Sequence, residues 1–287
     1  MHRSLVKPAN NDFNSSASLT LTLPFLKKDL MMTARTLAIS VQIYSLRTII
    51  GLDRQLDAAA VAGYRHVELI GAHLDNAADT RAKLDARGLK PSSSHVSIAA
   101  LRERFDAVMK ACGTLGITQL FMPSVPLEER NSGGAYWSAL GRELGQFSCR
   151  AKEYGIALGY HNHNWELKQK DGGVTALELL FDGAADSPLT WQVDVAWLVR
   201  AGVDPTLWMQ RYRDRIVSVH AKDLAPGGER LDEDGWADVG SGILNWNELW
   251  LACRDAGAKW LVAEHDRPND PERFLRASYG FLSNLKA

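Results

Sequence analysis

The sequence lacks an excess of charge of either sign. Its 287 residues include 33 Lys and Arg and 34 Asp and Glu, which gives a formal net charge of −1. A surface that binds nucleic acid needs cations to neutralise phosphates. No run of the sequence approaches the roughly 18 consecutive apolar residues that can span a membrane. We therefore expect neither nucleic acid nor a membrane as a partner.

Cysteine is also scarce. The three cysteines, Cys112, Cys149 and Cys253, are odd in number and far apart in the sequence, which argues against a disulfide framework. We expect reduced thiols in the core of a cytoplasmic protein. The contents of 46% hydrophobic and 23% charged residues are those of an ordinary globular chain, so fibrous and wholly disordered proteins are excluded.

The first 36 residues differ from the remainder. A polar run rich in Asn and Ser is followed by residues 19–26, in which Thr alternates with apolar residues. A secretory signal needs a basic start and an uninterrupted apolar centre, so it is disfavoured. We expect residues 1–36 to be an N-terminal extension, either flexible or preceding a true start at Met31 or Met32. Residues 37–287 are expected to form the functional domain.

From residue 37 onward, short apolar segments alternate with longer segments whose apolar residues recur every three or four positions. The short segments predict strands and the longer ones helices. The expected strands are residues 37–43, 66–70, 90–96, 119–122, 156–161, 190–195, 216–220 and 260–264. Helices are expected, among others, at residues 101–115, 137–154, 205–213, 246–256 and 271–285.

A glycine recurs where several of these helices should end, at Gly63, Gly88, Gly116, Gly155 and Gly257. Glycine supplies the left-handed residue that commonly ends a helix, so it marks successive helix-to-strand junctions. Eight strand–helix units in about 250 residues favour an α/β fold with a single (β/α)8 TIM barrel.

An open sheet of the Rossmann type is less favoured, because no strand is followed by a Gly-x-Gly-x-x-Gly turn. The segment at 239–242, VGSG, has two glycines and lacks the third. It predicts a flexible turn and only weakly a phosphate cradle.

Catalytic groups in such a barrel gather at the C-terminal ends of the strands. Strand alternation turns Asp194, His220 and Glu264 inward at the ends of three consecutive strands. Uncompensated buried carboxylates cost on the order of several kcal/mol each, and a divalent cation would offset that cost. These residues therefore predict a metal site. Mixed oxygen and nitrogen ligands suit Mn²⁺, Mg²⁺, Co²⁺ or Zn²⁺.

A further ligand is expected after the fifth strand, within residues 159–166. Alternation turns His161 and His163 inward, whereas Glu166 lies beyond the strand, where alternation no longer applies. One of the histidines could instead orient a ligand by a hydrogen bond. The residues alone leave the choice among the three open.

Several segments resemble those of the xylose isomerase-like TIM barrels of the sugar phosphate isomerases/epimerases, in the branch near the inosose isomerases and dehydratases. The segments are GYHNHNWE at 159–166, QVDVAW at 192–197, RIVSVHAKD at 215–223, VGSG at 239–242 and VAEHD at 262–266. The resemblance covers about residues 37–285. It implies a metal held by Glu166, Asp194, His220 and Glu264. Many members carry the first Glu inside the fifth strand, where this chain has Gly159, so that role falls to Glu166 or is shared with His161 or His163.

The resemblance implies a sugar isomerase or epimerase. Removing a proton next to a carbonyl group needs a metal that polarises the carbonyl and a carboxylate base. Glu166 and Glu264, one on each face of the sugar, are the expected bases. The inward Lys222 would stabilise an enediolate oxygen or form a salt bridge with Asp223 or Asp266.

A dehydratase or lyase of a keto-inositol, keto-sugar or 3-keto-glycoside is the alternative. Elimination also begins with loss of the proton next to the carbonyl, and it needs an acid for the leaving hydroxide. His161 or His163 would supply that acid, so the two imidazoles keep this alternative open.

Further polar residues at the strand ends, Gln42, Glu68 and His95, together with His161, are expected to bind sugar hydroxyl groups. Because no dense cluster of Arg and Lys indicates a phosphate pocket, we expect an unphosphorylated sugar. The tryptophans near the loops, which include Trp165 and Trp197, could stack on a sugar, but packing of helices on the barrel is the favoured role.

Two other classes of protein are less favoured than this enzyme. A metal-dependent apurinic endonuclease needs a cationic groove and a multinuclear His-rich centre, which the charge balance disfavours. A non-catalytic sugar-binding barrel is the third class. The prediction is an enzyme with a divalent metal and a small-molecule carbohydrate substrate, and whether it forms a homo-oligomer stays open.

Overall fold

The structure, a computed structural model, describes residues 1–2, 37–168 and 171–285. The expected N-terminal extension, residues 1–36, lies outside the described residues except for its first two positions.

Within the described residues, eight parallel strands close into a barrel in the order β1–β10–β7–β6–β5–β4–β3–β2. They are β1 (Ala38–Gln42), β2 (His66–Leu69), β3 (Lys90–His95), β4 (Gln119–Met122), β5 (Ala157–His161), β6 (Thr190–Asp194), β7 (Ile216–Ala221) and β10 (Trp260–Ala263). The predicted (β/α)8 barrel is confirmed, and each predicted strand agrees with an observed one to within one residue at either end.

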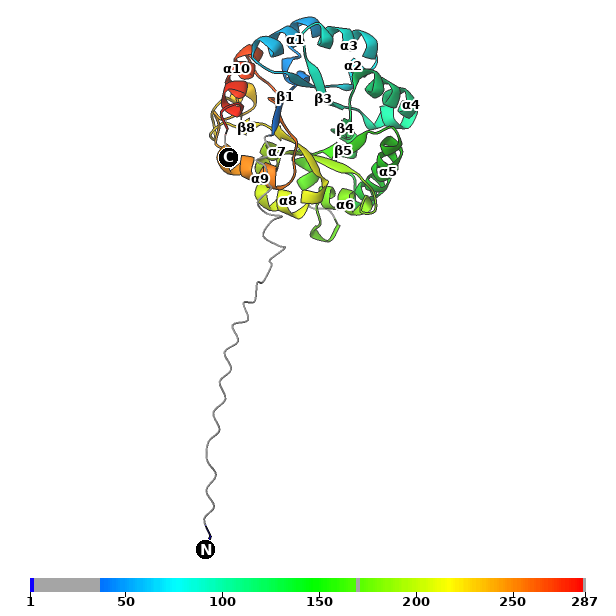
Figure 1. The fold of residues 1–287 in the computed structure, drawn as a ribbon, viewed down its shortest axis with the longest axis vertical. Helices are drawn as coiled ribbons and strands as arrows, with labels where there is room; N and C mark the ends of the chain where they lie inside the picture. Colours follow the sequence, from blue (N-terminus) through cyan, green and yellow to red (C-terminus); the bar gives the residue numbers. More distant parts are fainter. Residues whose placement is uncertain (3–36, 169–170, 286–287) are drawn as a thin grey trace. The chain divides into compact units, whose positions relative to one another are not determined.

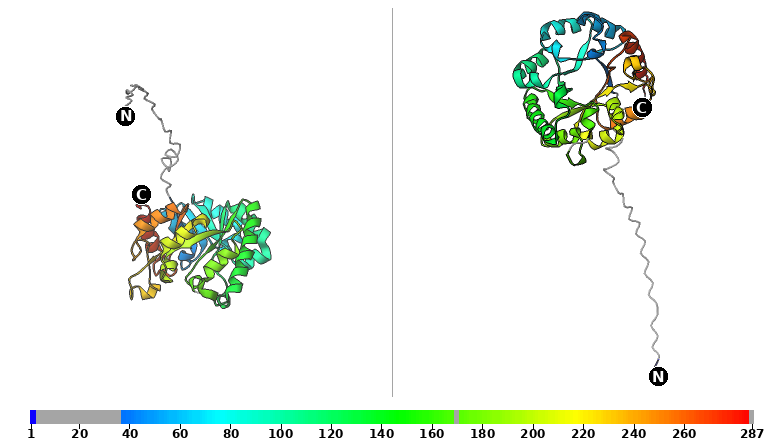
Figure 2. Two further views of the ribbon diagram at one scale, coloured as in Figure 1. Left: turned by 90° about the horizontal axis from the view of Figure 1, so that it is seen from below. Right: turned by 180° about the vertical axis from the view of Figure 1, so that it is seen from behind.

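Helices surround the barrel in a ring, which Figure 1 shows down the barrel and Figure 2 shows from two other directions. They are α1 (Leu52–Val61), α2 (Gly71–Leu74), α3 (Ala77–Asp85), α4 (Ile98–Leu115), α5 (Gly134–Glu153), α6 (Ala176–Gly183), α7 (Val195–Arg200), α8 (Pro205–Arg211), α9 (Trp246–Asp255) and α10 (Pro271–Leu282). In the part of the chain that is described, none of them has both the length and the hydropathy needed to cross a membrane.

The boundaries of α4 illustrate how the sequence defines a helix. The side chain of Ser97 accepts a hydrogen bond from the backbone N–H of Ala100 and so begins the helix three residues earlier than its apolar pattern predicts. Gly116 ends it in the left-handed conformation, with φ of 73°. The other four predicted junction glycines also have positive φ, so the prediction of these helix ends is confirmed.

The hydrophobic core lies between the barrel wall and the helices. Leu158 and Tyr160 of β5 and Trp191 and Val193 of β6 face this core, as strand alternation predicts. The interior of the barrel is instead rich in buried polar side chains. These are Ser40, Gln42, Glu68, Ser93, Gln192 and Ser218. The inward row of the strands therefore forms a polar support beneath the strand ends.

Two short strands after β7, β8 (Asp223–Leu224) and β9 (Trp236–Ala237), pair antiparallel to each other. Neither strand could be predicted from the sequence, because two residues are too few to show a period of two. Their pairing folds the long segment between β7 and α9 into an ordered loop.

The carboxylate of Asp223 organises the glycine-containing turn that follows. It accepts hydrogen bonds from the backbone N–H groups of Gly240, Gly242 and Leu244, at 3.0, 3.3 and 3.1 Å. The turn at 239–242, weakly predicted as a phosphate cradle, therefore directs its N–H groups at a carboxylate of the chain itself.

The cysteines follow the expectation in two of three cases. Cys112 and Cys253 are buried free thiols, whereas Cys149 is exposed. The prediction that Cys149 is a core thiol is wrong, because the buried face of α5 runs through Leu144, Ser148 and Ala151 and the residue after Ser148 points away from it.

Candidate metal and substrate site

The ends of four strands bring four potential ligands together. Asp194 of β6 lies opposite His220 of β7, and Glu264 follows the last residue of β10, which pairs with β7. His161 ends β5. The ligand atoms of His161, Asp194, His220 and Glu264 all lie within 4.8 Å of one another, and all four residues are buried. This group could hold a metal ion.

Lys222 brings a buried positive charge to the same place. Its Nζ lies 2.7 Å from Glu264 Oε2, 3.0 Å from Asp194 Oδ2 and 2.9 Å from Asp266 Oδ2. Burial alone would lower the pKa of Lys222, but the charges of these carboxylates hold it above its usual range. The predicted salt bridge with Asp266 is therefore present. Three carboxylates share this one ammonium group, which leaves the cluster short of positive charge.

Asp194 carries an oxygen that fits a metal ion. Oδ1 accepts a hydrogen bond of 2.9 Å from the backbone N–H of Trp197, whereas Oδ2 accepts none from the described residues, although Lys222 Nζ is 3.0 Å away. Burial raises the pKa of Asp194 against the opposing charge of Lys222. Lys222 already offers one cation to Oδ2, and a carboxylate oxygen has a second lone pair that remains for a metal ion. Together with the carboxylate and imidazole donors, this fits a divalent metal.

The protonation states of the group follow from its charges. His220 Nδ1 is 2.8 Å from Glu264 Oε2, and Nε2 is 2.6 Å from Glu68 Oε1. Burial alone would lower the pKa of His220, but the charges of Glu264 and Glu68 raise it to about 10. Against the effect of burial, Lys222 and His220 hold the pKa of Glu264 well below its usual range. Burial and the neighbouring imidazoles hold the pKa of His161 well below its usual range. The metal-free group thus combines a charged His220 with a neutral His161.

Glu68 fixes the inner side of the His220 ring. This fully buried carboxylate also accepts hydrogen bonds from Gln42 Nε2 at 2.8 Å, from Gln192 Nε2 at 2.6 Å and from the hydroxyl of Ser93. A carboxylate bonded to the second nitrogen of a metal-binding histidine orients its ring. Gln42 and Glu68 were predicted to bind substrate, but both are fully buried and neither lines the pocket. In this structure they bind other side chains inside the barrel.

Glu166, predicted as a metal ligand and a base, lies outside the group of four. Its Oε1 accepts a hydrogen bond of 2.7 Å from the hydroxyl of Tyr160, and its Oε2 accepts one of 2.9 Å from the backbone N–H of His163. His163 Nδ1 is 3.9 Å from Glu166 Oε1. Of the three candidates for the further ligand, the structure brings His161 to the other ligands. Alternation predicts that His161 and His163 both face inward, and β5 ends at His161, so alternation holds only for His161.

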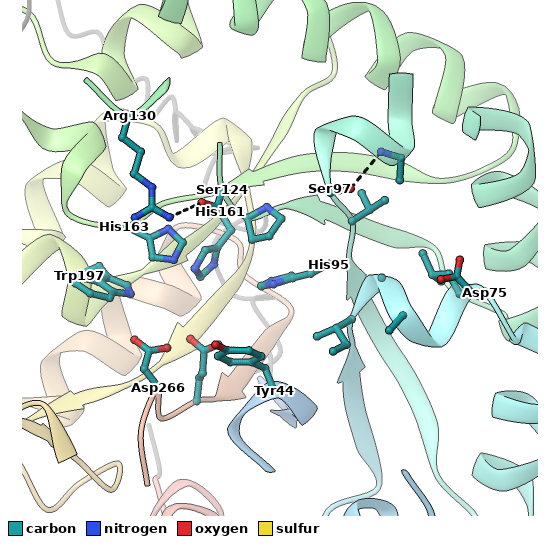
Figure 3. Close-up of a pocket in the computed structure, with 18 of the residues that line it drawn as sticks. Tyr44, Asp75, His95, Ser97, Ser124, Arg130, His161, His163, Trp197 and Asp266 are labelled. Carbon is teal, nitrogen blue, oxygen red and sulfur yellow. Dashed lines mark hydrogen bonds between the residues drawn. The ribbon is translucent and has the colours of Figure 1, made fainter. Parts of the chain in front are cut away.

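A cavity of about 760 Å³ adjoins the group. His161, Glu264 and Asp266 line it, together with His163 and His95, which were predicted as a catalytic and a substrate-binding residue. Figure 3 shows the side chains of His95, His161, His163 and Asp266 around one common space. Among the predicted site residues, three imidazoles and Glu264 line the cavity, whereas Lys222 and Asp194 do not.

Two tryptophans form part of the pocket wall. Trp165 and Trp197 line the cavity, and the ring of Trp165 stacks on that of His163 at 4.1 Å and 14°. The guanidinium group of Arg130 lies 3.7 Å from the Trp165 ring centroid on the same wall. The sequence analysis favoured a packing role for these tryptophans, since a loop position alone does not show which way a side chain faces.

An eight-stranded parallel barrel with carboxylates and imidazoles at its strand ends defines a TIM-barrel protein with a candidate metal site. The chain belongs to the xylose isomerase-like TIM barrel family, whose model matches residues 56–285. The family resemblance of the sequence segments is thereby confirmed.

Two curated relatives are informative. The chain is 28% identical to an inosose dehydratase of Lacticaseibacillus casei over 152 residues, which are 48% of this chain and 49% of that protein. This match thus spans about half the length of the relative. The chain is also 26% identical to the rhizopine catabolism protein MocC of Rhizobium meliloti over 269 residues, which are 80% of this chain and 79% of that protein.

Two solved structures share the fold. A sugar phosphate isomerase/epimerase from Parabacteroides distasonis superposes with a TM-score of 0.72 at 21% identity, covering 89% of this chain and 97% of that chain. The IolI protein with a bound zinc atom superposes with a TM-score of 0.65 at 16% identity, covering 88% of this chain and 100% of that chain. Both likenesses concern the fold.

Proposed function

We propose that this protein is a divalent-metal-dependent enzyme that removes a proton next to a carbonyl group of a carbohydrate. The observation that carries the proposal is the group of His161, Asp194, His220 and Glu264, whose ligand atoms lie within 4.8 Å of one another beside a large cavity. The zinc atom of the IolI protein and the inosose dehydratase relative support it. His161 takes the part that the family resemblance assigns to a glutamate.

The bound metal would polarise the substrate carbonyl as a Lewis acid and so acidify the neighbouring C–H group. Glu264 would be the base, because its carboxylate lines the cavity beside the ligand group. Lys222 positions it through their 2.7 Å ion pair. Glu68 would act through His220, by fixing its ring.

The proposed reaction is a β-elimination, as in a dehydratase or lyase. Glu264 and Asp266 follow β10, whereas His161 and His163 lie at the end of β5, three strands further round the barrel, with β7 and β6 in between. The base and the imidazoles thus approach the cavity from different sides. Glu264 would take the proton, the C–H electron pair would form the new double bond, and the β-oxygen would leave with a proton donated by His163. The products are an unsaturated ketone and water or an alcohol.

Epimerisation, through an enediolate, is the second candidate. It needs a second group that returns a proton to the opposite face of the same carbon. The pair of His163 and Glu166, with Nδ1 3.9 Å from Oε1, favours it, because His163 could donate this proton with Glu166 balancing its charge. The two reactions share Glu264 and differ in where the proton from His163 goes.

Metal retention is the direct test of the site. After loading with Mn²⁺ or Zn²⁺ and gel filtration, the protein should retain about one metal ion per chain by elemental analysis. His161→Ala, Asp194→Ala and His220→Ala should lose it, whereas Glu166→Gln, with both oxygens outside the group, is the matched control that should retain it. Full retention in His161→Ala, or loss only in Glu166→Gln, would refute the proposed ligand set.

The reaction is tested with inososes, keto-sugars and 3-keto-glycosides in the presence of Mn²⁺. An enone chromophore indicates elimination, whereas a new epimer with solvent deuterium at one carbon indicates epimerisation. Glu264→Gln should suppress deuterium exchange into the substrate in either case. If no substrate of these classes exchanges its proton with solvent in the metal-loaded protein, the proposed function is wrong.

A further inference from the structure

The cavity extends well beyond the candidate metal group. Its volume of about 760 Å³ lies in the range of about 300–1,000 Å³ that holds drug-sized ligands, which is more than a single sugar ring fills. Part of its lining comes from segments that follow β2 and β3. In the barrel order these strands stand opposite β6 and β7, which carry Asp194 and His220. The cavity therefore has a second end across the barrel from the ligand group.

This second end has a different chemical character. Its lining includes Ile70, Leu74, Val96 and Ala100, which we call the apolar subsite. Leu74, Val96 and Ala100 are packed into the protein, whereas Ile70 is only half-buried. The three buried residues thus form a firmly packed wall, and Ile70 adds accessible apolar surface.

The charged residues at this end do not offer a net charge to a ligand. Arg104 and Asp75 line the cavity beside the apolar subsite and form an ion pair with each other. Figure 3 shows Asp75 and Ser97 on one side of the cavity and Trp197, His163 and Asp266 on the other, with His95 between them. A ligand that fills the cavity would present polar groups to one end and an uncharged apolar group to the other.

We infer that the substrate is a keto-glycoside whose aglycone is apolar and uncharged, with the aglycone bound in the apolar subsite and the sugar ring at the metal group. The inference rests on the proposed function, because the proposed function sets which end receives the sugar. A free monosaccharide or inosose would leave the apolar subsite in contact with water. Each methylene group that the subsite buries should tighten binding about three- to four-fold.

Binding of unreactive ligands tests the subsite apart from the chemistry. We would titrate the metal-loaded protein calorimetrically with methyl, propyl, pentyl and heptyl β-glucosides. Affinity should rise about three- to four-fold per methylene until the subsite is filled. An affinity that does not depend on chain length would overturn the inference, whatever the protein catalyses.

Matched variants locate the effect. Ala100→Phe should fill the subsite and abolish the dependence on chain length, whereas Ala99→Phe, at the exposed neighbouring position of α4 outside the cavity, should keep it. Ala72→Phe, an exposed position that also lines the cavity, should weaken the dependence and serves if Ala100→Phe does not fold. A chain-length dependence that persists unchanged in both Ala100→Phe and Ala72→Phe would overturn the assignment to this subsite.

Turnover separates this inference from the proposed function. 3-Keto-glycosides with the same aglycones should show kcat/KM rising with chain length in the wild type and in Ala99→Phe, and Ala100→Phe should remove that rise. Chain-length-dependent binding without any proton exchange would contradict the proposed function and leave the subsite in place. Proton exchange with equal kcat/KM for all aglycones would contradict the inference alone.

Discussion

The ammonium group of Lys222 faces three carboxylates inside the protein, so its removal tests the charge balance of the ligand group directly. Its Nζ lies 2.7, 3.0 and 2.9 Å from oxygens of Glu264, Asp194 and Asp266, and the side chain is fully buried. Lys222→Met keeps most of the volume and removes the charge. Breaking a buried ion pair by removing one partner costs about 3–5 kcal/mol, so the metal-free variant should lose that much of its free energy of unfolding.

The assay is urea unfolding in EDTA, repeated with Mn²⁺. Lys83→Met is the control, because Lys83 also contacts two carboxylates, those of Asp53 and Asp79 at 3.3 and 2.8 Å, but on the surface, where ion pairs contribute little. Mn²⁺ at about a hundred times its Kd stabilises a protein by about 2.7 kcal/mol. At equal Mn²⁺ the variant should gain more than the wild type, since the metal then supplies the missing charge. If Lys222→Met costs no more than Lys83→Met, the description of the charge cluster is wrong.

Three further predictions concern the same region. Because the pKa of His220 is raised to about 10, this side chain holds a proton at pH 8 that a metal must displace. Calorimetry of metal binding at pH 8, in buffers of different ionisation enthalpy, should find about one proton released per metal ion. A histidine of ordinary pKa, about 6.5, would release almost none. Gly159→Ala should lower the free energy of unfolding by about 1–3 kcal/mol, since the new Cβ would lie 2.5 Å from the side-chain oxygen of Thr190. Gly113→Ala, where no atom lies within 4 Å of the new Cβ, should not lower it. Equal melting temperatures of the two variants would contradict this. Tyr160→Phe should cost about 1–3 kcal/mol by leaving buried Glu166 without its 2.7 Å donor, and strict additivity with Glu166→Gln in a double-mutant cycle would contradict the coupling.

The barrel could be predicted from the sequence because two local signals agree along the chain. The strand segments recur with helical segments between them, and glycines such as Gly116 mark the junctions. Strand alternation also predicted the inward direction of Asp194 and His220, since a period of two is a property of each strand by itself.

Depth along the barrel axis could not be predicted in the same way. Glu68 was expected to bind sugar hydroxyl groups, but whether a side chain at a strand end reaches the cavity depends on the stagger between strands, which no single segment encodes. The position of Glu166 is set by a turn beyond β5, where its hydrogen bonds with Tyr160 and His163 decide its direction. Both residues therefore needed the three-dimensional structure.

Asp223 gives the loop after β7 a built-in anion. Loops in this part of a barrel often bind a phosphate group of the substrate through backbone N–H groups, but here those of Gly240, Gly242 and Leu244 are already saturated by a carboxylate from the same chain. None of these residues lines the cavity. One side chain thus holds the shape of the whole turn, and a substitution that removes its carboxylate would leave three backbone N–H groups without their acceptor.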